Sequence, residues 1–160
     1  MVSTLLTRYL KPFIRSDLKE RMVFLGGPRQ VGKTTLSQSL IQSYKDGHPA
    51  YLNWDFLEHR ELIKNHGWPK NEKLIVLDEI HKYKLWQNLI KGFYDTLKNT
   101  HSFLITGSAR LDHFRKGGDS LLGRYHYYRL HPYTMNEIGN TKENFEKLFK
   151  FGGFPESYHK

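Results

Sequence analysis

The nine residues from 27 to 35 constrain the fold of this chain more strongly than any other stretch. They read Gly-Pro-Arg-Gln-Val-Gly-Lys-Thr-Thr and match the phosphate-binding pattern of Gly, four residues and then Gly-Lys-Ser/Thr. An apolar run with the length of a buried strand, residues 22–26, comes directly before them. From Lys33 to about Ser43, apolar residues recur at helical spacing. The order of strand, glycine-containing loop and helix predicts an α/β fold of the P-loop type.

The chemistry of this loop follows from its residue types. Gly27 and Gly32 allow the backbone to turn with its N–H groups pointing inward, where they can surround a phosphate. The positive end of the following helix adds to the attraction. Lys33 is expected to reach the outer phosphates, and the Thr34 hydroxyl to bind the magnesium ion (Mg²⁺) that bridges them. The predicted nucleotide-binding residues are Gly27, Pro28, Arg29, Gln30, Val31, Gly32, Lys33, Thr34 and Thr35.

Two carboxylates follow the most apolar run of the chain. Residues 74–77 read Leu-Ile-Val-Leu, which is typical of a strand buried on both faces of a parallel sheet, and Asp78 and Glu79 come directly after it. Asp78 follows Lys33 by 45 residues, which leaves room for one β–α unit between them. In a P-loop ATPase, Asp78 would hold magnesium and Glu79 would polarise the attacking water as general base. The competing interpretation is a strand followed by an acidic helix cap.

Polar side chains also follow two other predicted strands. The strand over residues 101–105 ends in Thr106-Gly107-Ser108, where a hydroxyl could lie between the two carboxylates and the γ-phosphate. Thr106 and Ser108 are both candidates for sensing that phosphate, and their spacing does not choose between them. Asp55 follows a strand predicted over 50–53, and we expect it to cap the helix predicted over 58–65.

The remaining segments are predicted from apolar periodicity and from Gly and Pro positions. Residues 1–20 are expected to form an opening helix that Pro12 kinks or splits. A helix is predicted over 85–97, a mobile loop over 115–119 and a final strand over 124–130. The Tyr and Arg residues of that strand are expected to pack as in ordinary strands, rather than to stack on bases. Residues 134–150 are predicted to be helical with a break at Gly139, and 151–155 to form a turn before an unfinished tail.

Composition limits the class of protein. The 160 residues suffice for one domain, 38% of them are hydrophobic, and none is cysteine. Arg8 and Lys11 interrupt the apolar N-terminal residues too early for a signal peptide, and no apolar run approaches the length needed to span a bilayer. We therefore expect a cytoplasmic protein without membrane insertion. The net charge of +9 is scattered along the chain, so it does not by itself identify nucleic acid, a membrane surface or an acidic protein as the partner.

Together the motifs resemble the N-terminal ATPase core of a family of bacterial and archaeal AAA+-like ATPases, whose larger C-terminal domain is poorly understood. The resemblance rests on residues 27–35, 78–82, 106–110, 122–124, 130–133 with Glu137, and 152–155. It implies a three-layer α/β/α fold with a five-stranded parallel sheet, and ATP and magnesium at the C-terminal edge of that sheet. It also implies that Glu79 activates water and that a polar residue near 106–108 senses the γ-phosphate. Arg124, or else Arg110, would stabilise transition-state charge, in its own subunit or across a subunit boundary.

Proteins of that family continue past the Gly-Gly-Phe-Pro stretch of residues 152–155 into a helical region and a C-terminal domain, which this chain lacks. The resemblance therefore implies one ATPase core over 1–160, with an N-terminal helical segment over 1–20 and the start of a truncated region at 151–160. The expected function is magnesium-dependent hydrolysis of ATP to ADP and phosphate through Walker A and Walker B motifs. Hydrolysis would switch the conformation of the missing domain or of a protein partner, with oligomerisation open. ATP is expected over GTP because no Asn-Lys-x-Asp box is present.

Three other functions stay open at this point. The stretch Asp-Glu-Ile-His at 78–81 and the net charge also match a helicase-like motor, although the 45-residue gap is short for that class and nucleic acid is not otherwise indicated. A small-molecule kinase could use Arg110, Arg115 and Arg124 around an acceptor. A non-hydrolysing module would only bind nucleotide or a protein.

Overall fold

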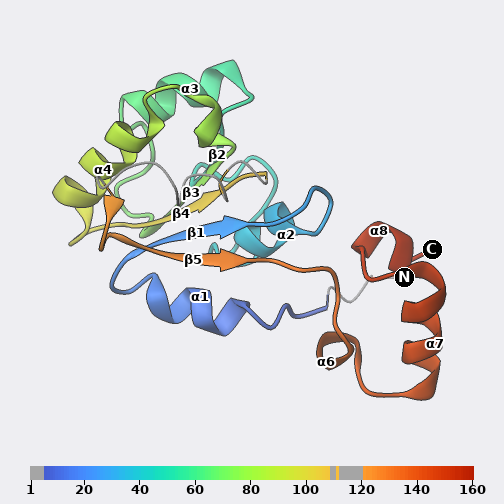
Figure 1. Ribbon diagram of the computed structural model, residues 1–160. Helices are drawn as coiled ribbons and strands as arrows, with labels where there is room; N and C mark the ends of the chain where they lie inside the picture. The colour runs from blue at the N-terminus through green and yellow to red at the C-terminus, as the bar shows by residue number, and fades with distance from the viewer. Residues whose placement is uncertain (1–5, 109–110, 112–120) are drawn as a thin grey trace.

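A parallel β-sheet of five strands forms the centre of the molecule in the computed structural model, which describes residues 6–108, 111 and 121–160 (Figure 1). The strands run in the order β2-β3-β4-β1-β5, and every neighbouring pair is parallel. Their bounds are β1 Met22–Gly26, β2 Tyr51–Asn53, β3 Leu74–Asp78, β4 Ser102–Thr106 and β5 Tyr125–Arg129. The predicted α/β class and the five-stranded parallel sheet are confirmed.

Helices cover both faces of this sheet. Helices α3 (Leu57–Lys64) and α4 (Trp86–Leu97) lie on one side of it, and α1 (Lys11–Asp17) lies on the other (Figure 1). The connection from β1 to β2 crosses the sheet in the opposite direction to the connections from β2 through β4. Because parallel crossovers are right-handed, α2 (Lys33–Gln38) packs on the face opposite α3 and α4, against β3 and β4.

The register of the strands brings the polar strand ends to one edge. Asn53 pairs with Asp78, and Asp78 pairs with Thr106. Thr106 in turn lies beside Leu25, one residue before β1 ends at Gly26. The connection that follows β1 runs toward β2, whereas the connection from β4 to β5 passes β1 in the opposite direction. Because the direction of the connections reverses at β1, a crevice is expected outside its carboxyl end.

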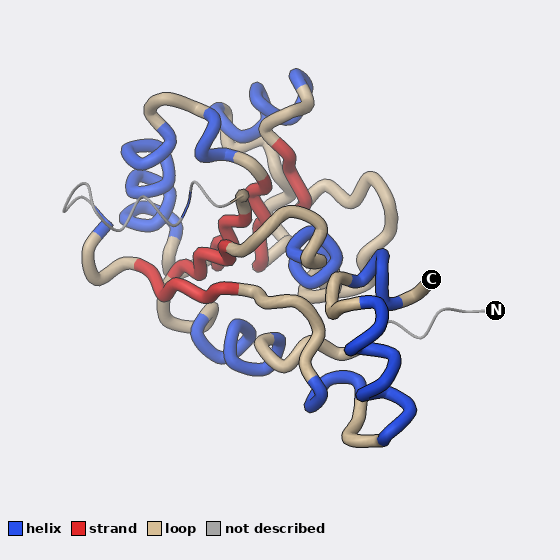
Figure 2. The backbone as a smooth tube through the Cα atoms, turned by 45° about the vertical axis from the view of Figure 1, so that its right-hand side comes forward, coloured by secondary structure: helices blue, strands red, loops and turns tan. Residues whose placement is uncertain are grey.

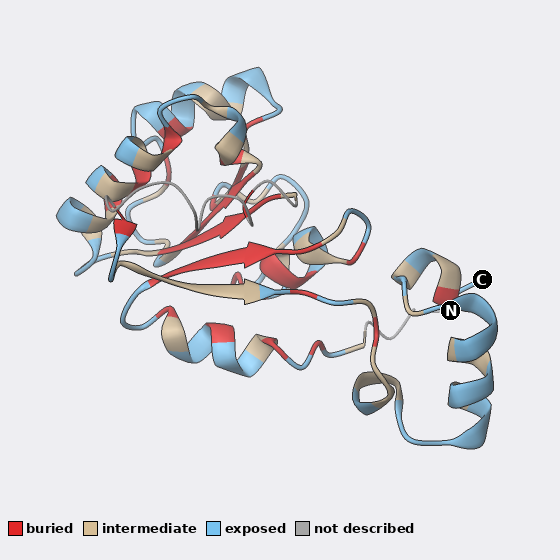
Figure 3. Ribbon diagram, in the orientation of Figure 1, coloured by how far each residue is buried: buried red, intermediate tan, exposed pale blue. Residues whose placement is uncertain are grey.

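The core explains why the middle strands are so apolar. All five residues of β1 are buried, as are the last four of β3 and of β4 (Figure 3). Phe93 of α4 stacks on Phe103 of β4, and Trp68 packs edge-on against both rings. The strands that carry the polar ends are thus held rigidly between two helical layers.

Two helices differ from the sequence-based prediction. Residues 6–10 are not helical, and α1 begins at Lys11, with Pro12 in its first turn; Pro12 therefore starts a helix and kinks none. Helix α2 ends at Gln38, well before the predicted Ser43. The hydroxyls of Ser37 and Ser39 donate to backbone carbonyls three residues earlier, and i→i+3 backbone bonds replace the helical pattern after them.

The C-terminal part forms three short helices beside the sheet (Figures 1 and 2). They are α6 (Met135–Ile138), α7 (Lys142–Phe151) and α8 (Pro155–Tyr158). The predicted break at Gly139 is confirmed, with φ at +95°. The prediction that the tail completes no element is wrong: it forms α8, in which Pro155 supplies a preorganised first turn. Within the described residues, none of the helices has the length and apolar character that crossing a membrane requires.

Candidate functional site

The loop between β1 and α2 takes a conformation that its glycines make available. Gly27 has φ at +137° and Gly32 has φ at +97°, while Gln30 also lies in the left-handed region at +60°. A Cβ atom at Gly27 would overlap the backbone carbonyl of Leu130. Position 27 therefore excludes every side chain, which is a stronger requirement than the sequence pattern alone states.

Lys33, the first residue of α2, curls back over this loop. Its Nζ atom donates to the carbonyl oxygens of Gly27 at 3.0 Å and Pro28 at 2.6 Å. The ammonium group is thus placed inside the loop by two backbone acceptors. An anionic phosphate oxygen entering the loop would meet this cation directly.

The carboxylate of Asp78, at the end of β3, is surrounded by hydroxyl donors. Thr34 Oγ1 donates to Oδ2 at 3.2 Å, Tyr51 OH donates to the same oxygen at 2.5 Å, and Thr106 Oγ1 donates to Oδ1 at 2.5 Å. Asp78 is only 5% exposed. Burial, together with the neighbouring Asp78 carboxylate, raises the pKa of Tyr51, so its phenol stays a donor at neutral pH.

Glu79 follows in an unusual backbone conformation, with φ at +58°. Its N–H donates to the carbonyl of Thr106 at 2.9 Å, which ties the residue to the end of β4. Its Oε2 atom lies 3.2 Å from Lys82 Nζ and 3.6 Å from His81 Nε2. The left-handed backbone at this position turns the chain out of the sheet, and the two adjacent carboxylates have different hydrogen-bond and charge partners.

Asp55 does not cap the following helix, contrary to the sequence-based expectation. Phe56 occupies the N-cap position of α3, and no side-chain cap bond is formed there. Both Asp55 oxygens instead accept from Lys82 Nζ at 2.6 Å. The Asp55 carboxylate thus pairs with the charged ammonium group of Lys82 and not with a backbone N–H. Because Lys82 also contacts Glu79, it bridges the two carboxylates.

A cavity of about 400 Å³ brings most of the predicted residues together. Thr106 is not among its lining residues; it is fully buried behind Asp78, whereas Ser108 reaches the cavity and lies 3.4 Å from His81 Nε2. The lining residues are Arg29, Gln30, Gly32, Lys33, Thr34, Thr35, Asp78, Glu79, Ser108, Pro155 and Glu156.

Arg124 is not brought to this cavity within the chain. It lies just before β5, level with the start of β1, since its carbonyl accepts from Met22 N–H at 3.0 Å. This is the edge of the sheet opposite the phosphate-binding loop. Its guanidinium donates to Asp95 at 2.8 and 3.3 Å, and this bond lowers the pKa of the Asp95 carboxyl. Arg110 and Arg115 lie outside the described residues.

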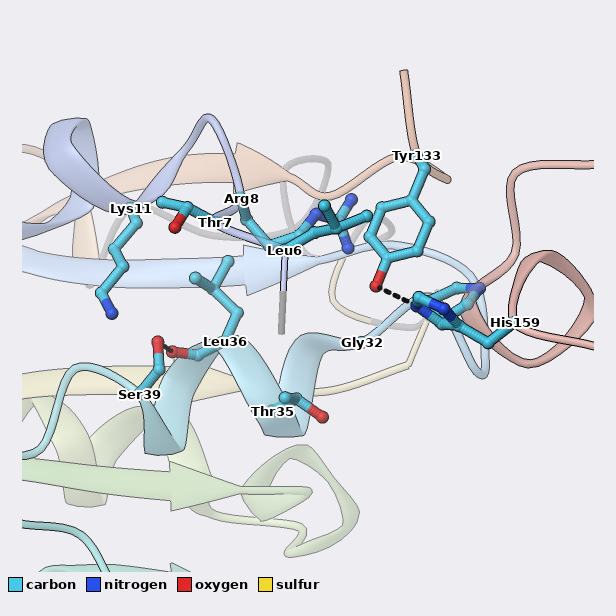
Figure 4. A pocket seen from close by; sticks show the side chains of 11 residues that line it. Leu6, Thr7, Arg8, Lys11, Gly32, Thr35, Leu36, Ser39, Tyr133 and His159 are labelled. Carbon is cyan, nitrogen blue, oxygen red and sulfur yellow. Dashed lines mark hydrogen bonds between the residues drawn. The ribbon is translucent and has the colours of Figure 1, made fainter. Parts of the chain in front are cut away.

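A second cavity of about 170 Å³ adjoins the first at Gly32, Thr35 and Pro155 (Figure 4). In Figure 4, Lys11 and Thr7 of the N-terminal segment and Leu36 of α2 lie toward the left, and Tyr133 and His159 lie toward the right. Sequence reasoning missed Arg8, Tyr51 and Tyr133. Their contacts join residues that are far apart in the sequence. Of the three, only Tyr133 lies in a stretch on which the family resemblance rests, residues 130–133.

Comparisons with known proteins agree with this arrangement. A protein-family model described as "AAA domain" matches residues 19–139. A search of curated proteins found no match. Among solved structures, a STAND (signal transduction ATPase with numerous domains) protein with a tetratricopeptide repeat sensor from Pyrococcus horikoshii aligns at a TM-score of 0.57 and 15% identity. That alignment covers 94% of this chain and 29% of the other.

The RuvB Holliday junction branch migration motor of Thermotoga maritima aligns at a TM-score of 0.51 and 19% identity, over 83% of this chain and 48% of that one. Because the identities are only 15% and 19%, these two alignments show that the folds are similar and nothing more. The chain spans less than half the length of either protein.

Proposed function

The chain belongs to the AAA domain family, and from that premise we propose that it binds ATP with magnesium and hydrolyses ATP to ADP and phosphate. One observation carries the proposal. Lys33, Thr34 and the carboxylates of Asp78 and Glu79 all line one cavity at the carboxyl edge of the sheet. A cation, a hydroxyl and two carboxylates around a phosphate-binding loop are the groups that phosphoryl transfer to water requires.

Magnesium fits the oxygen donors that the chain offers. Thr34 Oγ1 and Asp78 Oδ2 are 3.2 Å apart, and hydroxyl and carboxylate oxygens are ligands that Mg²⁺ accepts. Bound there, Mg²⁺ would neutralise charge on the phosphates. Tyr51 and Thr106 fix the Asp78 carboxylate in place through their hydroxyls.

We assign the general-base role to Glu79. Its carboxylate lines the cavity, and contacts with Lys82 and His81 hold it in position. A base so placed would orient a water molecule and take its proton as the water oxygen bonds to the γ-phosphorus and the bond from that phosphorus to ADP breaks. Ser108 is the better candidate for the phosphate sensor because it reaches the cavity, whereas Thr106 acts on the Asp78 carboxylate.

The base of the nucleotide is assigned to the smaller cavity, which is mostly apolar and begins where the loop ends. Its walls include Leu6, Leu36 and the Tyr133 ring. Adenine is the proposed base, because the chain contains no Asn-Lys-x-Asp stretch that would read guanine. Pro155 lines both cavities, so α8 forms part of the wall of the proposed nucleotide site.

In this proposal hydrolysis drives a conformational switch of a C-terminal domain or a partner protein. The fold likeness covers 29% of the STAND protein, which is described as having a tetratricopeptide repeat sensor. A cytoplasmic location and oligomerisation stay predictions, and transition-state stabilisation by Arg124 would have to act on a neighbouring subunit. A nucleic-acid-dependent ATPase is the second candidate, because the Asp-Glu-Ile-His stretch at 78–81 matches a helicase-like box and the net charge of +9 is compatible with it.

Phosphate release with ATP and magnesium tests the proposal. Wild type is expected to release phosphate without any added acceptor, which would count against a kinase. Glu79→Gln should retain ATP binding while its phosphate release falls by 100-fold or more, on the order of a lost general base. Glu146→Gln, on the exposed surface of α7, is the matched control and should behave as wild type. ATP binding with no phosphate release by wild type would instead identify a non-hydrolysing module.

A further inference from the structure

Arg8 is a buried arginine to which the proposed reaction gives no role. Its side chain is 6% exposed, and its three nitrogen atoms donate to three separate segments. Nε donates to Glu137 Oε1 at 2.8 Å, one terminal nitrogen donates to the carbonyl of Val31 at 2.7 Å, and the other donates to the carbonyl of His131. The guanidinium also lies 4.8 Å from the centre of the Tyr133 ring.

The side chain of Glu137 is buried even more completely, at 1% exposed, and both of its carboxylate oxygens accept hydrogen bonds. Its Oε1 atom accepts from Arg8 and from the Tyr9 N–H at 3.1 Å. Its Oε2 atom accepts from the Thr134 N–H at 2.9 Å, in a capping box that begins α6. With both carboxylate oxygens satisfied, Glu137 can hold the Arg8 side chain in one orientation.

The bond to Val31 acts on the phosphate-binding loop itself. A loop whose N–H groups converge on a phosphate must direct carbonyl oxygens away from it, and these need donors elsewhere. Lys33 donates hydrogen bonds to the carbonyls of Gly27 and Pro28, and Arg8 donates one to the carbonyl of Val31. A Cβ atom at Gly32 would lie 3.3 Å from an Arg8 terminal nitrogen, so the guanidinium packs directly against the loop backbone.

We propose that Arg8 is a positioning residue for the phosphate-binding loop, with Glu137 as its anchor. Arg8 fixes the outward carbonyl of Val31 and so keeps the neighbouring N–H groups directed at the phosphates. Lysine cannot replace it, because a single ammonium group cannot reproduce the planar fork that joins Glu137, Val31 and His131. The proposal rests on nucleotide binding as proposed above and deepens it.

Affinities for two probes, inorganic tripolyphosphate and ATP, test this role by calorimetry with magnesium present. Arg8→Lys should weaken both by the same factor of about ten or more, the size of a lost charge-assisted hydrogen bond. Glu137→Gln keeps the shape of the anchor without its charge and should weaken both by a smaller common factor. Arg15→Lys, on the exposed side of α1, is the control and should change neither.

The outcomes separate positioning from a purely structural role. Arg8 also lines the base cavity, so loss of ATP affinity with unchanged tripolyphosphate affinity would show that it acts on the base and not on the loop, and would overturn the proposal. Unchanged affinities with a lowered melting temperature would also overturn it, since Arg8 would then act on folding alone.

Hydrogen exchange of the unliganded protein keeps the two proposals distinguishable if wild type binds neither probe. Absence of binding by wild type would contradict the proposed function. Exchange at residues 27–35 would still test whether Arg8 and Glu137 position the loop. Faster exchange confined to this loop and to its neighbours in Arg8→Lys supports positioning, and exchange equal to that of wild type overturns it.

Discussion

Gly27 shows most sharply how a single position constrains the loop. Its φ of +137° and its closeness to the Leu130 carbonyl each exclude a side chain. We predict that Gly27→Ala lowers the free energy of unfolding by clearly more than about 1 kcal/mol and abolishes ATP binding. Gly47→Ala is a matched control, because Gly47 has φ at +79° but open space around it. Chemical denaturation and calorimetry compare the two, and equal destabilisation would contradict the steric argument.

The hydroxyls of Thr106, the last residue of β4, and of Ser108, just after it, should have different effects when they are removed. Thr106→Val removes a buried donor to Asp78 at nearly constant volume, so we expect a loss of about 1–2 kcal/mol in stability and weaker magnesium-dependent binding. Ser108→Ala should leave the melting temperature unchanged and lower the rate of phosphate release. Denaturation and steady-state kinetics measure both, and the reverse pattern would return the sensor role to Thr106.

At the scale of single residues, the sequence predicted what lies within contiguous motifs. Lys33, Thr34 and the Asp78–Glu79 pair meet in one cavity as expected, because the P-loop pattern and the end of a buried strand fix them locally. Arg8 and Glu137 are 129 positions apart, so no pattern within a short stretch of sequence predicts that they pair. Arg124 carries a motif but lies at the opposite edge of the sheet.

At the scale of elements, Asp17 fastens the end of α1 to the edge strand β5. It accepts from Tyr128 OH at 2.6 Å, and this bond is the largest cause of a lowered pKa of Asp17. Because that pKa is lower in the folded state, the bond adds stability above the ordinary value of 3.8 and loses it as the pH falls through the folded value.

Tyr128→Phe should therefore lower the free energy of unfolding by about 1 kcal/mol at pH 7. The difference from wild type should shrink as Asp17 becomes protonated below about pH 4. Urea denaturation at pH 7 and at about pH 2.5 measures it. A difference that stays constant over this range would show that the bond does not depend on the Asp17 charge.

Apolar patterns predicted the strands and α4, and the glycine at position 139 predicted the break there. Such patterns failed where side chains compete with the backbone. Serine hydroxyls end α2 early, and Pro12 begins a helix instead of interrupting one. The C-terminal tail forms α8 and reaches the site, which depends on the contact between Gly153 and Tyr133, where the Tyr133 N–H donates to the Gly153 carbonyl at 2.7 Å.

At the scale of the whole molecule, the net charge of +9 leaves a nucleic-acid partner to be tested. The positive side chains of the nucleotide site account for only part of that charge. We expect labelled DNA at low salt to give a flat anisotropy titration and to leave phosphate release unchanged. Tight binding with a steep salt dependence would favour the nucleic-acid-dependent alternative.

The central claim is that this chain by itself carries a nucleotide site. The measurement that tests it most directly is calorimetric titration of the 160-residue chain with a non-hydrolysable ATP analogue and magnesium, with Lys33→Ala in parallel. We predict binding in the micromolar range for wild type and none for Lys33→Ala, whose loop loses the cation bound to the Gly27 and Pro28 carbonyls. Equal binding by both proteins, or none by wild type, would contradict the account.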